Sequence, residues 1–281
     1  MSTVSSCGLE KVDAMASFAY EYRGCYDAIV LSGDLATTGS TADLDEVLAL
    51  LWPATDGYLG SDGRPTLRAA SKPILLIPGN HDRFGSTWAI YPPGNTRFDQ
   101  VLGRHWSAGQ DAQELWLCRK GQSTLVLIGA DFTLRADELG EGPWGYLGQG
   151  RAYVEPISKL CQLTQNARKR DPDAIVLWVI HFDPTVENGS LRLLDKDNFR
   201  AAVQRERIAA VLCGHMHRNY DTLAGATVYV CGTTTQEYAP DGNFLNLIEI
   251  EVPAGSHAPT IRVLTFMLDA EREKQFVPVP P

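Results

Sequence analysis

Six side chains that can bind or work beside a divalent metal ion follow short apolar runs of the sequence. They are Asp34, Asn80, His81, His181, His215 and His217. Carboxylate, carboxamide and imidazole groups suit Zn, Mn or Fe better than a metal that prefers sulfur ligands. On an extended strand, His215 and His217 on either side of Met216 would face the same way as a chelating pair. The set therefore predicts a transition-metal centre.

Each of these residues, taken alone, also has a purely structural explanation. Gly33-Asp34 and the run 78–82 are typical of tight turns. A single histidine such as His181 is more often a hydrogen-bonded core residue than a ligand. The other two histidines, His105 and His257, do not follow such apolar runs, and we interpret them as surface or packing residues. The joint pattern, rather than any one part of it, favours a metal site.

The apolar runs themselves are expected to be buried strands. They span residues 28–31, 74–77, 175–180 and 208–213. Continuous runs of branched apolar residues are typical of strands covered on both faces. Amphipathic helices are expected at residues 12–22, 44–51, 153–170 and 198–206, the second after a capping pattern at Ser40 and Asp43. In α/β folds, sites form at strand ends because the rigid sheet positions the loops.

The rest of the chain favours a single domain over residues 1–281 with a β-rich end. A hairpin is expected from strands 115–119 and 123–128, with its turn at Lys120-Gly121. Further strands are expected at 227–231, 243–252 and 260–268. The segment 270–281, which ends in a proline-rich run, is expected to be a loose tail. The order of elements predicts an α/β fold with mixed sheets in the middle.

Composition and charge restrict the partners of the protein. The 281 residues carry a net charge of −9. This charge argues against an extended, positively charged surface for nucleic acid and favours a small substrate. The six cysteines form no CxxC pair and are expected to be reduced thiols. No apolar run approaches the roughly 20 residues of a membrane span, and no signal peptide is visible. We therefore expect a cytoplasmic protein with no membrane partner.

The motifs together resemble one known family. Gly33-Asp34, Gly79-Asn80-His81-Asp82, Ile180-His181 and Gly214-His215-Met216-His217, in this order and spacing, are similar to the motifs of the calcineurin-like metallophosphoesterases. The resemblance covers roughly residues 25 to 235. It implies a four-layer α/β/β/α sandwich with two mixed β-sheets and a site at the strand ends. It also implies hydrolysis of a phosphomonoester or phosphodiester.

The resemblance also implies a role for each site residue. Asp34 would bridge two metal ions. Asn80, His181 and His215 would complete the shell of one ion, and His217 would bind the other. His81 would protonate the leaving oxygen or stabilise the transition state, and Asp82 would orient His81 through its other ring nitrogen. Two ions roughly 3.5–4 Å apart can hold and acidify a water and clamp the attacking and leaving oxygens.

The sequence departs from the family at its start. The family opens with a strand ending in Asp-x-His, whose two residues bind the same ion as His217. Residues 1–33 contain no histidine. Three explanations compete: the recorded start lies downstream of the natural one, which we favour; the chain is a shortened form that binds one metal ion; or it has lost catalysis and kept a binding role. The cofactors expected are thus two Mn, Fe or Zn ions in an intact site, or one ion in this chain.

Two other functions remain open from the sequence. One is a non-catalytic module with a single structural or regulatory metal ion, which the missing motif favours. Structural zinc sites commonly use thiolates, and the candidate ligands include no cysteine. The other is a nuclease of the same fold, which the acidic balance disfavours. The substrate, the metal and the oligomeric state are not encoded in any pattern that we find.

Overall fold

A computed structural model describes most of the chain. The described residues are 9–52, 66–83, 96–106, 111–117, 123–135, 138, 148–187, 189–216, 220–223, 226–231, 234, 242–252, 259–269 and 275–279. Within these ranges no helix is both long and apolar enough to cross a membrane. The predicted hairpin turn at 120–121 lies outside them.

The largest sheet has six strands in the order β3-β4-β6-β8-β10-β9. Its strands are β3 (Ala112–Leu117), β4 (Leu125–Ala130), β6 (Ile175–Val179), β8 (Ala210–Cys213), β9 (Tyr220–Leu223) and β10 (Ala226–Val230). The four inner strands are parallel, and β3 and β9 pair antiparallel at the two edges. The carboxyl ends of the inner strands therefore share one edge of the sheet. The predicted hairpin of β3 and β4 is confirmed.

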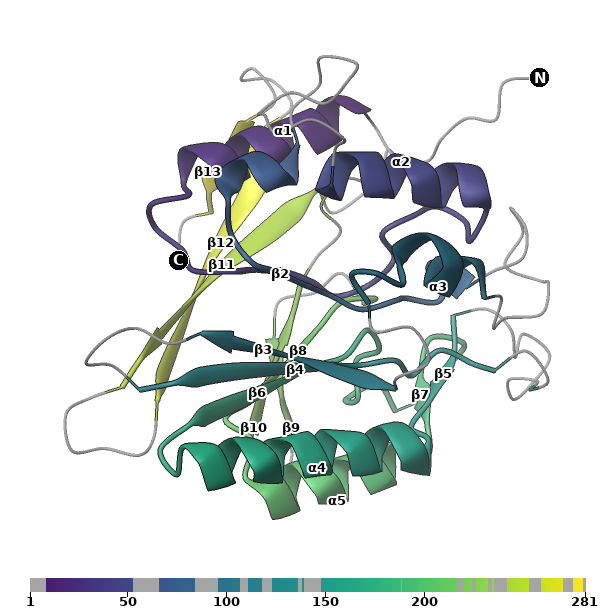
Figure 1. Cartoon of the computed structure of the whole chain (residues 1–281), viewed down its shortest axis with the longest axis vertical. Coiled ribbons are helices and arrows are strands. Elements are labelled where there is room, and N and C mark those ends of the chain that lie inside the picture. The colour runs from purple at the N-terminus through teal and green to yellow at the C-terminus, as the bar shows by residue number, and fades with distance from the viewer. Residues whose placement is uncertain are drawn as a thin grey trace.

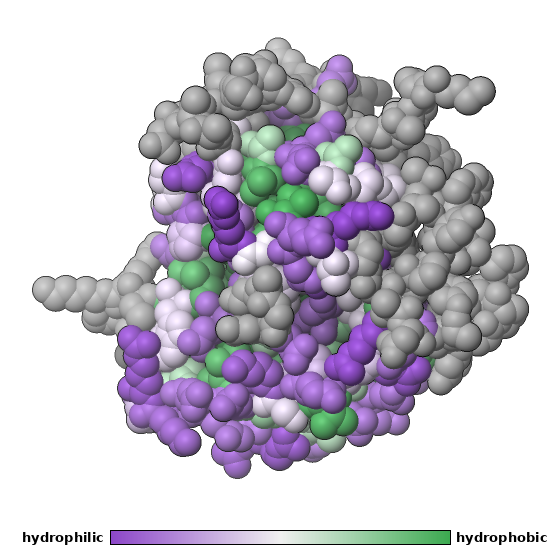
Figure 2. Space-filling model, turned by 45° about the vertical axis from the view of Figure 1, so that its right-hand side comes forward, coloured by the Kyte–Doolittle hydropathy of each residue, from purple (hydrophilic) through white to green (hydrophobic). Residues whose placement is uncertain are grey.

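Two helices cover one face of this sheet, α4 (Val154–Arg170) and α5 (Lys196–Glu206) (Figure 1). All residues of β6 and β8 are buried, because their apolar side chains pack on both faces of the sheet. At the level of α4 and α5, the outer surface is mostly hydrophilic (Figure 2). Both helices thus bury an apolar side against the sheet and expose a hydrophilic side to solvent.

A second, two-stranded sheet lies on the opposite face. It pairs β1 (Ile29–Leu31) with β2 (Ile74–Leu76) in parallel, with Ile29 opposite Ile74. Above it in Figure 1 lie α1 (Leu9–Glu21) and α2 (Thr41–Leu51). The Ser40 side chain accepts a hydrogen bond from the Asp43 amide at the start of α2, which confirms the predicted cap.

Shorter elements connect the parts described so far. They are two 3₁₀ turns, η1 (Leu67–Ala70) and η2 (His81–Arg83), the helix α3 (Arg97–Leu102), and a small parallel sheet of β5 (Gly150–Arg151) and β7 (Leu193–Leu194).

The carboxyl-terminal part forms an antiparallel sheet of β11 (Phe244–Glu251), β12 (Thr260–Asp269) and β13 (Gln275–Pro278). The strand β13 corrects the predicted loose tail. Val277 pairs with Met267, and Phe276 is buried with its ring 6.0 Å from that of Phe18 in α1. The two prolines in the last three residues suggested a loose end, but the alternating apolar side chains before them bury this segment against α1.

The predicted mixed α/β class is confirmed, and the described residues form four sheets where two were predicted. The strand β1 also differs from expectation. Its three residues are only partly buried, although their branched apolar side chains are typical of an inner strand. The strand β1 borders a cavity that β11 also lines, which explains its partial exposure.

Candidate metal centre

Loops that follow four parallel strands bring the predicted ligands together. Asp34 follows β1, Asn80 follows β2, His181 follows β6 and His215 follows β8. The strands come from two different sheets, so the centre lies where the carboxyl ends of both sheets meet. Asn80 and His181 are buried, at 5% and 1% exposure, while the side chain of Asp34 is 27% exposed.

His181 lies in the middle of the centre and contacts the three other described ligands. Its Nε2 atom lies 3.0 Å from Asn80 Oδ1, 3.1 Å from His215 Nδ1 and 3.2 Å from Asp34 Oδ2. Its Nδ1 atom lies 2.7 Å from the carbonyl oxygen of Ser32. A carbonyl oxygen only accepts hydrogen bonds, so we assign the proton to Nδ1.

This donor set fits a divalent metal ion. With its proton on Nδ1, neutral His181 directs the lone pair of Nε2 at the oxygens of Asn80 and Asp34 and at a nitrogen of His215. If His181 is charged instead, its single Nε2 proton can serve only one of these three neighbours. A cation bound by all four groups would satisfy their lone pairs, which the available protons cannot do. The donor atoms of Asp34, His181 and His215 lie within 4.8 Å of one another, and their type suits a first-row transition metal.

Unusual backbone conformations hold two of the ligands. Asp34 and His215 have φ angles of 54° and 69°, in the left-handed region that non-glycine residues rarely adopt. Such strain persists only where the surrounding structure enforces it, and it gathers at functional sites. Both residues follow a glycine, Gly33 or Gly214.

Two glycines permit the ligand loops to touch. A β-carbon on Gly79 would overlap the backbone nitrogen and Oδ1 of Asp34. A β-carbon on Gly33, whose φ is 99°, would lie 2.5 Å from His181 Nδ1. Glycine is therefore required at both positions for this packing.

When no cation is bound and His181 is protonated, its charge and that of Asp34 stabilise each other. Burial favours the neutral form of Asp34, but the neighbouring imidazole of His181 outweighs burial and holds the pKa of Asp34 below its usual range. Burial lowers the pKa of His181, while Asp34 raises it, and the net direction is upward. Asp34 is thus an anion that is ready to bind a cation.

His81 and Asp82 have partners other than those predicted. The Nδ1 atom of His81 lies 2.9 Å from the Thr37 carbonyl oxygen, and its backbone amide donates to Asp34 Oδ1. The Asp82 carboxylate accepts from the backbone amides of three residues, Leu35, Ala36 and Gly79. The expected bond from Asp82 to a ring nitrogen of His81 is thus replaced by a role for Asp82 in joining the two ligand loops.

The environment of Asp82 explains this role. Its side chain is fully buried. Burial and the nearby Asp34 carboxylate raise the pKa of Asp82 to about 6, although the three backbone amides favour its charged form. A short loop whose amides need an acceptor holds this carboxyl group in place, and the histidine beside it is held by a backbone carbonyl.

His217 lies outside the described residues, so its predicted role for a second metal ion stays a prediction. The structure brings together Asp34, Asn80, His181 and His215 and places His81 beside Asp34.

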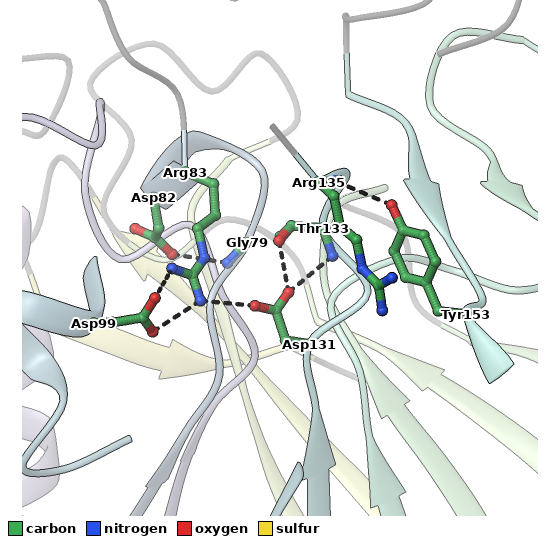
Figure 3. Close-up of polar contacts among 8 residues, drawn as sticks. All are labelled: Gly79, Asp82, Arg83, Asp99, Asp131, Thr133, Arg135 and Tyr153. Atoms are coloured by element: carbon green, nitrogen blue, oxygen red, sulfur yellow. Dashed lines mark hydrogen bonds and ion pairs between the residues drawn. The ribbon is translucent and has the colours of Figure 1, made fainter. Parts of the chain in front are cut away.

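One buried cation was missed from the sequence. Arg83, at 7% exposure, donates two hydrogen bonds to Asp99, of 2.5 and 3.0 Å, and one of 2.8 Å to Asp131 (Figure 3). Burial lowers the pKa of Arg83, but Asp131 and Asp99 outweigh it and raise that pKa. Asp131 directly follows β4, another inner strand of the large sheet, and this position at a strand end was the available signal. Arg83 therefore anchors η2, which carries His81, to α3 and to the six-stranded sheet.

We expect Arg83→Met to destabilise the fold. The change leaves two partly buried carboxylates without their cation, which costs about 3 kcal/mol or more and lowers the melting temperature by roughly 10 °C. Thermal unfolding followed by circular dichroism measures this. Arg262→Met is the matched control, because Arg262 is 62% exposed and lies 3.8 Å from an exposed Glu251. Equal melting temperatures for the two variants would contradict the anchoring role.

Comparisons with known proteins agree with this geometry. A family model described as calcineurin-like phosphoesterase matches residues 12–219. No curated protein sequence matches the chain. Among solved structures, the chain is similar to a dimetal phosphatase from Danio rerio, with a TM-score of 0.56 and 12% identity over 95% of this chain and 88% of that one. It is also similar to GAP50 of Plasmodium, the anchor in the inner membrane complex, with a TM-score of 0.53 and 10% identity over 96% and 83%.

At these identities the two structures show the fold alone. The family model extends over more than half of the sequence and includes the four described ligands. The resemblance seen in the sequence motifs is thereby confirmed, and the chain belongs to the calcineurin-like phosphoesterase family.

Proposed function

We propose that the protein hydrolyses a small phosphomonoester or phosphodiester at the centre built around His181. The observation that carries this proposal is the meeting of Asn80, His215 and Asp34 at the Nε2 atom of His181, directly beside His81. Membership of the family supports a metal-dependent phosphoesterase. A purely structural metal site would not need a further histidine, such as His81, beside its ligands.

The residues divide into ligands and a proton donor. Asp34, Asn80, His181 and His215 would hold a divalent ion, with Mn, Fe and Zn as the candidates, and His217 would serve a second one. When bound, such ions supply an acidified water and neutralise the charge that develops on the phosphate. The Thr37 carbonyl fixes the proton on Nδ1 of His81. In the charged imidazolium, Nε2 carries the second proton, and this is the proton that would pass to the leaving oxygen.

The test combines metal analysis with a turnover assay. The purified chain is loaded with Mn²⁺ or Zn²⁺, its metal content per chain is measured by elemental analysis, and hydrolysis of an aryl phosphomonoester and an aryl phosphodiester is followed. Bound metal with turnover supports the proposal, and the better of the two substrates distinguishes phosphatase from phosphodiesterase. Bound metal without turnover of either ester would contradict it.

A substitution of His81 separates catalysis from metal binding. We expect His81→Ala to keep the metal content of the parent and to lose about 100-fold or more in turnover, as removal of a general acid does. The reason is that the ring of His81 contacts a backbone carbonyl and is absent from the ligand cluster. Turnover unchanged by His81→Ala would exclude this residue as the proton donor.

A second candidate function is a family member that binds one metal ion and has little or no catalytic activity. Among the described residues, a single group of possible metal ligands, Asp34, His181 and His215, favours it. GAP50, the anchor in the inner membrane complex of Plasmodium, has a similar fold. One metal ion per chain with no turnover is the result expected from this candidate. Two ions per chain would require ligands that lie outside those described.

The net charge bears on the class of substrate, and the thiols bear on the cellular compartment. A net charge of −9 favours small substrates over nucleic acid. Among the described residues, Cys25, Cys161 and Cys231 are free thiols. They fit a reducing compartment such as the cytoplasm.

A further inference from the structure

The carbonyl that contacts the His81 ring belongs to a peptide group that a carboxylate from α2 holds. Nδ1 of His81 lies 2.9 Å from the carbonyl oxygen of Thr37. The N–H of the same peptide group is that of Thr38, and it donates a hydrogen bond of 3.1 Å to Asp43 Oδ2. The group is planar and trans, so its N–H and C=O point in opposite directions. Fixing the N–H of Thr38 therefore fixes the direction in which the Thr37 carbonyl points.

Asp43 holds Thr38 by two hydrogen bonds. Besides its N–H, the hydroxyl of Thr38 donates to Asp43 Oδ2, at 2.6 Å. Thr38 is buried, at 4% exposure. Hydrogen bonds to a charged acceptor are stronger than neutral ones, and a buried donor that loses its partner is costly. The peptide group between Thr37 and Thr38 thus has little freedom to turn.

This contact is not the usual one for a residue at the start of a helix. Ser40 is the N-cap of α2, and Asp43 follows three residues later. In a capping box, the side chain at that later position accepts from the backbone amide of the N-cap residue. Here the amide of Ser40 donates to the Thr38 hydroxyl instead, at 3.2 Å, and the Asp43 carboxylate reaches past it to Thr38. Asp43 therefore serves the loop beside the metal centre as well as the helix.

The same loop is also held just before Thr37. The Asp82 carboxylate accepts from the amides of Leu35 and Ala36, at 3.2 and 2.8 Å. Carboxylates from η2 and α2 thus hold the chain directly before and directly after Thr37. The position of the Thr37 carbonyl is therefore set by side chains from two other elements.

We propose that Asp43 is a positioning residue for His81 and acts through the peptide group between Thr37 and Thr38. The Asp43 carboxylate fixes the N–H of this group, and the carbonyl accepts from Nδ1 of His81, which keeps Nε2 available for the leaving oxygen. Hydrogen bonds in a chain also strengthen one another, by roughly 10–30% per bond. Asp43 thus has, through one peptide group, the orienting role that the sequence assigned to Asp82. The proposal rests on the proposed function, because it takes His81 as the proton donor.

Two substitutions of Asp43 test this route. Asp43→Ala removes both bonds from Thr38, whereas Asp43→Asn keeps a carbonyl oxygen that can accept them. The first readout is the ¹⁵N chemical shifts of the His81 ring, with and without Zn²⁺, which report the nitrogen that carries the proton. His81→Ala identifies these signals, and the measurement needs no hydrolysis. The second readout is kcat and KM for the aryl phosphate that the parent hydrolyses better.

We expect Asp43→Ala to shift the His81 signals toward the tautomer with its proton on Nε2. It should lower kcat on the order of tenfold and change KM by less than about twofold, because the contact orients the proton donor rather than binding substrate. Asp43→Asn should keep the parent's signals and a kcat within about threefold, since neutral hydrogen bonds remain at roughly half the strength. Equal His81 signals in the parent and in Asp43→Ala would overturn the proposal.

Ser40→Ala and Asp45→Asn are the matched controls. Ser40→Ala removes the bond from the Asp43 amide to the Ser40 hydroxyl and leaves the Asp43 side chain in place. Asp45→Asn removes an exposed charge from the same helix. Both should keep the parent's His81 signals and kcat. If Ser40→Ala lowers kcat as much as Asp43→Ala does, the effect belongs to the start of α2 and the proposal is overturned.

Two further outcomes are informative. If Asp43→Ala does not fold, Thr38→Val takes its place, because it removes the 2.6 Å bond at nearly unchanged volume. It should shift the His81 signals in the same direction, and unchanged signals would overturn the proposal. If the parent binds metal but hydrolyses neither ester, the proposed function fails. The His81 signals of the Asp43 variants then still decide whether Asp43 orients the ring.

Discussion

Replacing His181 with alanine is expected to release the metal ion and to abolish hydrolysis. The Nε2 atom of His181 lies 3.0, 3.1 and 3.2 Å from atoms of the three other described ligands. Its loss also removes the neighbour that holds the pKa of Asp34 low. Replacement of a metal ligand's outer partners costs roughly 10–100-fold in affinity or activity, and loss of this central ligand should exceed that range. Elemental analysis and the aryl phosphate assay measure both effects.

His105→Ala provides the control for this experiment. His105 stacks on Trp52, with ring centroids 3.3 Å apart, and it belongs to no cluster of ligand atoms among the described residues. The two variants remove the same side chain from the same protein. Metal content should therefore fall in His181→Ala and stay at the parent level in His105→Ala. A His181→Ala protein that retains the parent's metal content would refute the centre described here.

The second large effect is expected from a single added methyl group. In Gly79→Ala, the new β-carbon would overlap the backbone nitrogen and Oδ1 of Asp34, so the loops after β1 and β2 must move apart. Asp34 and Asn80 would then no longer meet at His181. Both metal binding and turnover should be lost, and stability should fall by about 1–3 kcal/mol, as is typical of overpacking.

Gly24→Ala is the matched glycine variant. A β-carbon on Gly24 meets no atom within 4 Å, so this change should leave metal content, turnover and melting temperature near those of the parent. Elemental analysis and thermal unfolding of the pair separate the contact at Gly79 from any general effect of replacing a glycine. Normal metal binding by Gly79→Ala would show that the two loops do not need this close approach.

Much of the fold and of the site was predictable because both depend on local signals. The runs that became β6 and β8 consist of apolar residues, and a polar ligand follows each of them. Parallel strands of one sheet bring such ends to one edge, so His181 and His215 could be grouped without knowing any distance.

Other features depend on contacts between segments that are distant in the sequence. Nothing next to Arg83 in the sequence indicates that Asp99 and Asp131 would surround it. The pairing of Asp82 with backbone amides was likewise hidden, because amides are present at every position and only the loop geometry directs three of them to one carboxylate. The strand β13 depends on burial against α1, which its own proline content obscured.

The turn 79–83 also bears on the dynamics of the protein. Its side chains bond to four separate parts of the chain: His181, the loop after β1, α3 and Asp131. The turn therefore cannot open locally without releasing contacts in both halves of the molecule. Segments tied in this way exchange their amide hydrogens only in large cooperative openings. The turn 79–83 should thus belong to the slowest-exchanging unit of the protein, although turns as a class usually exchange early.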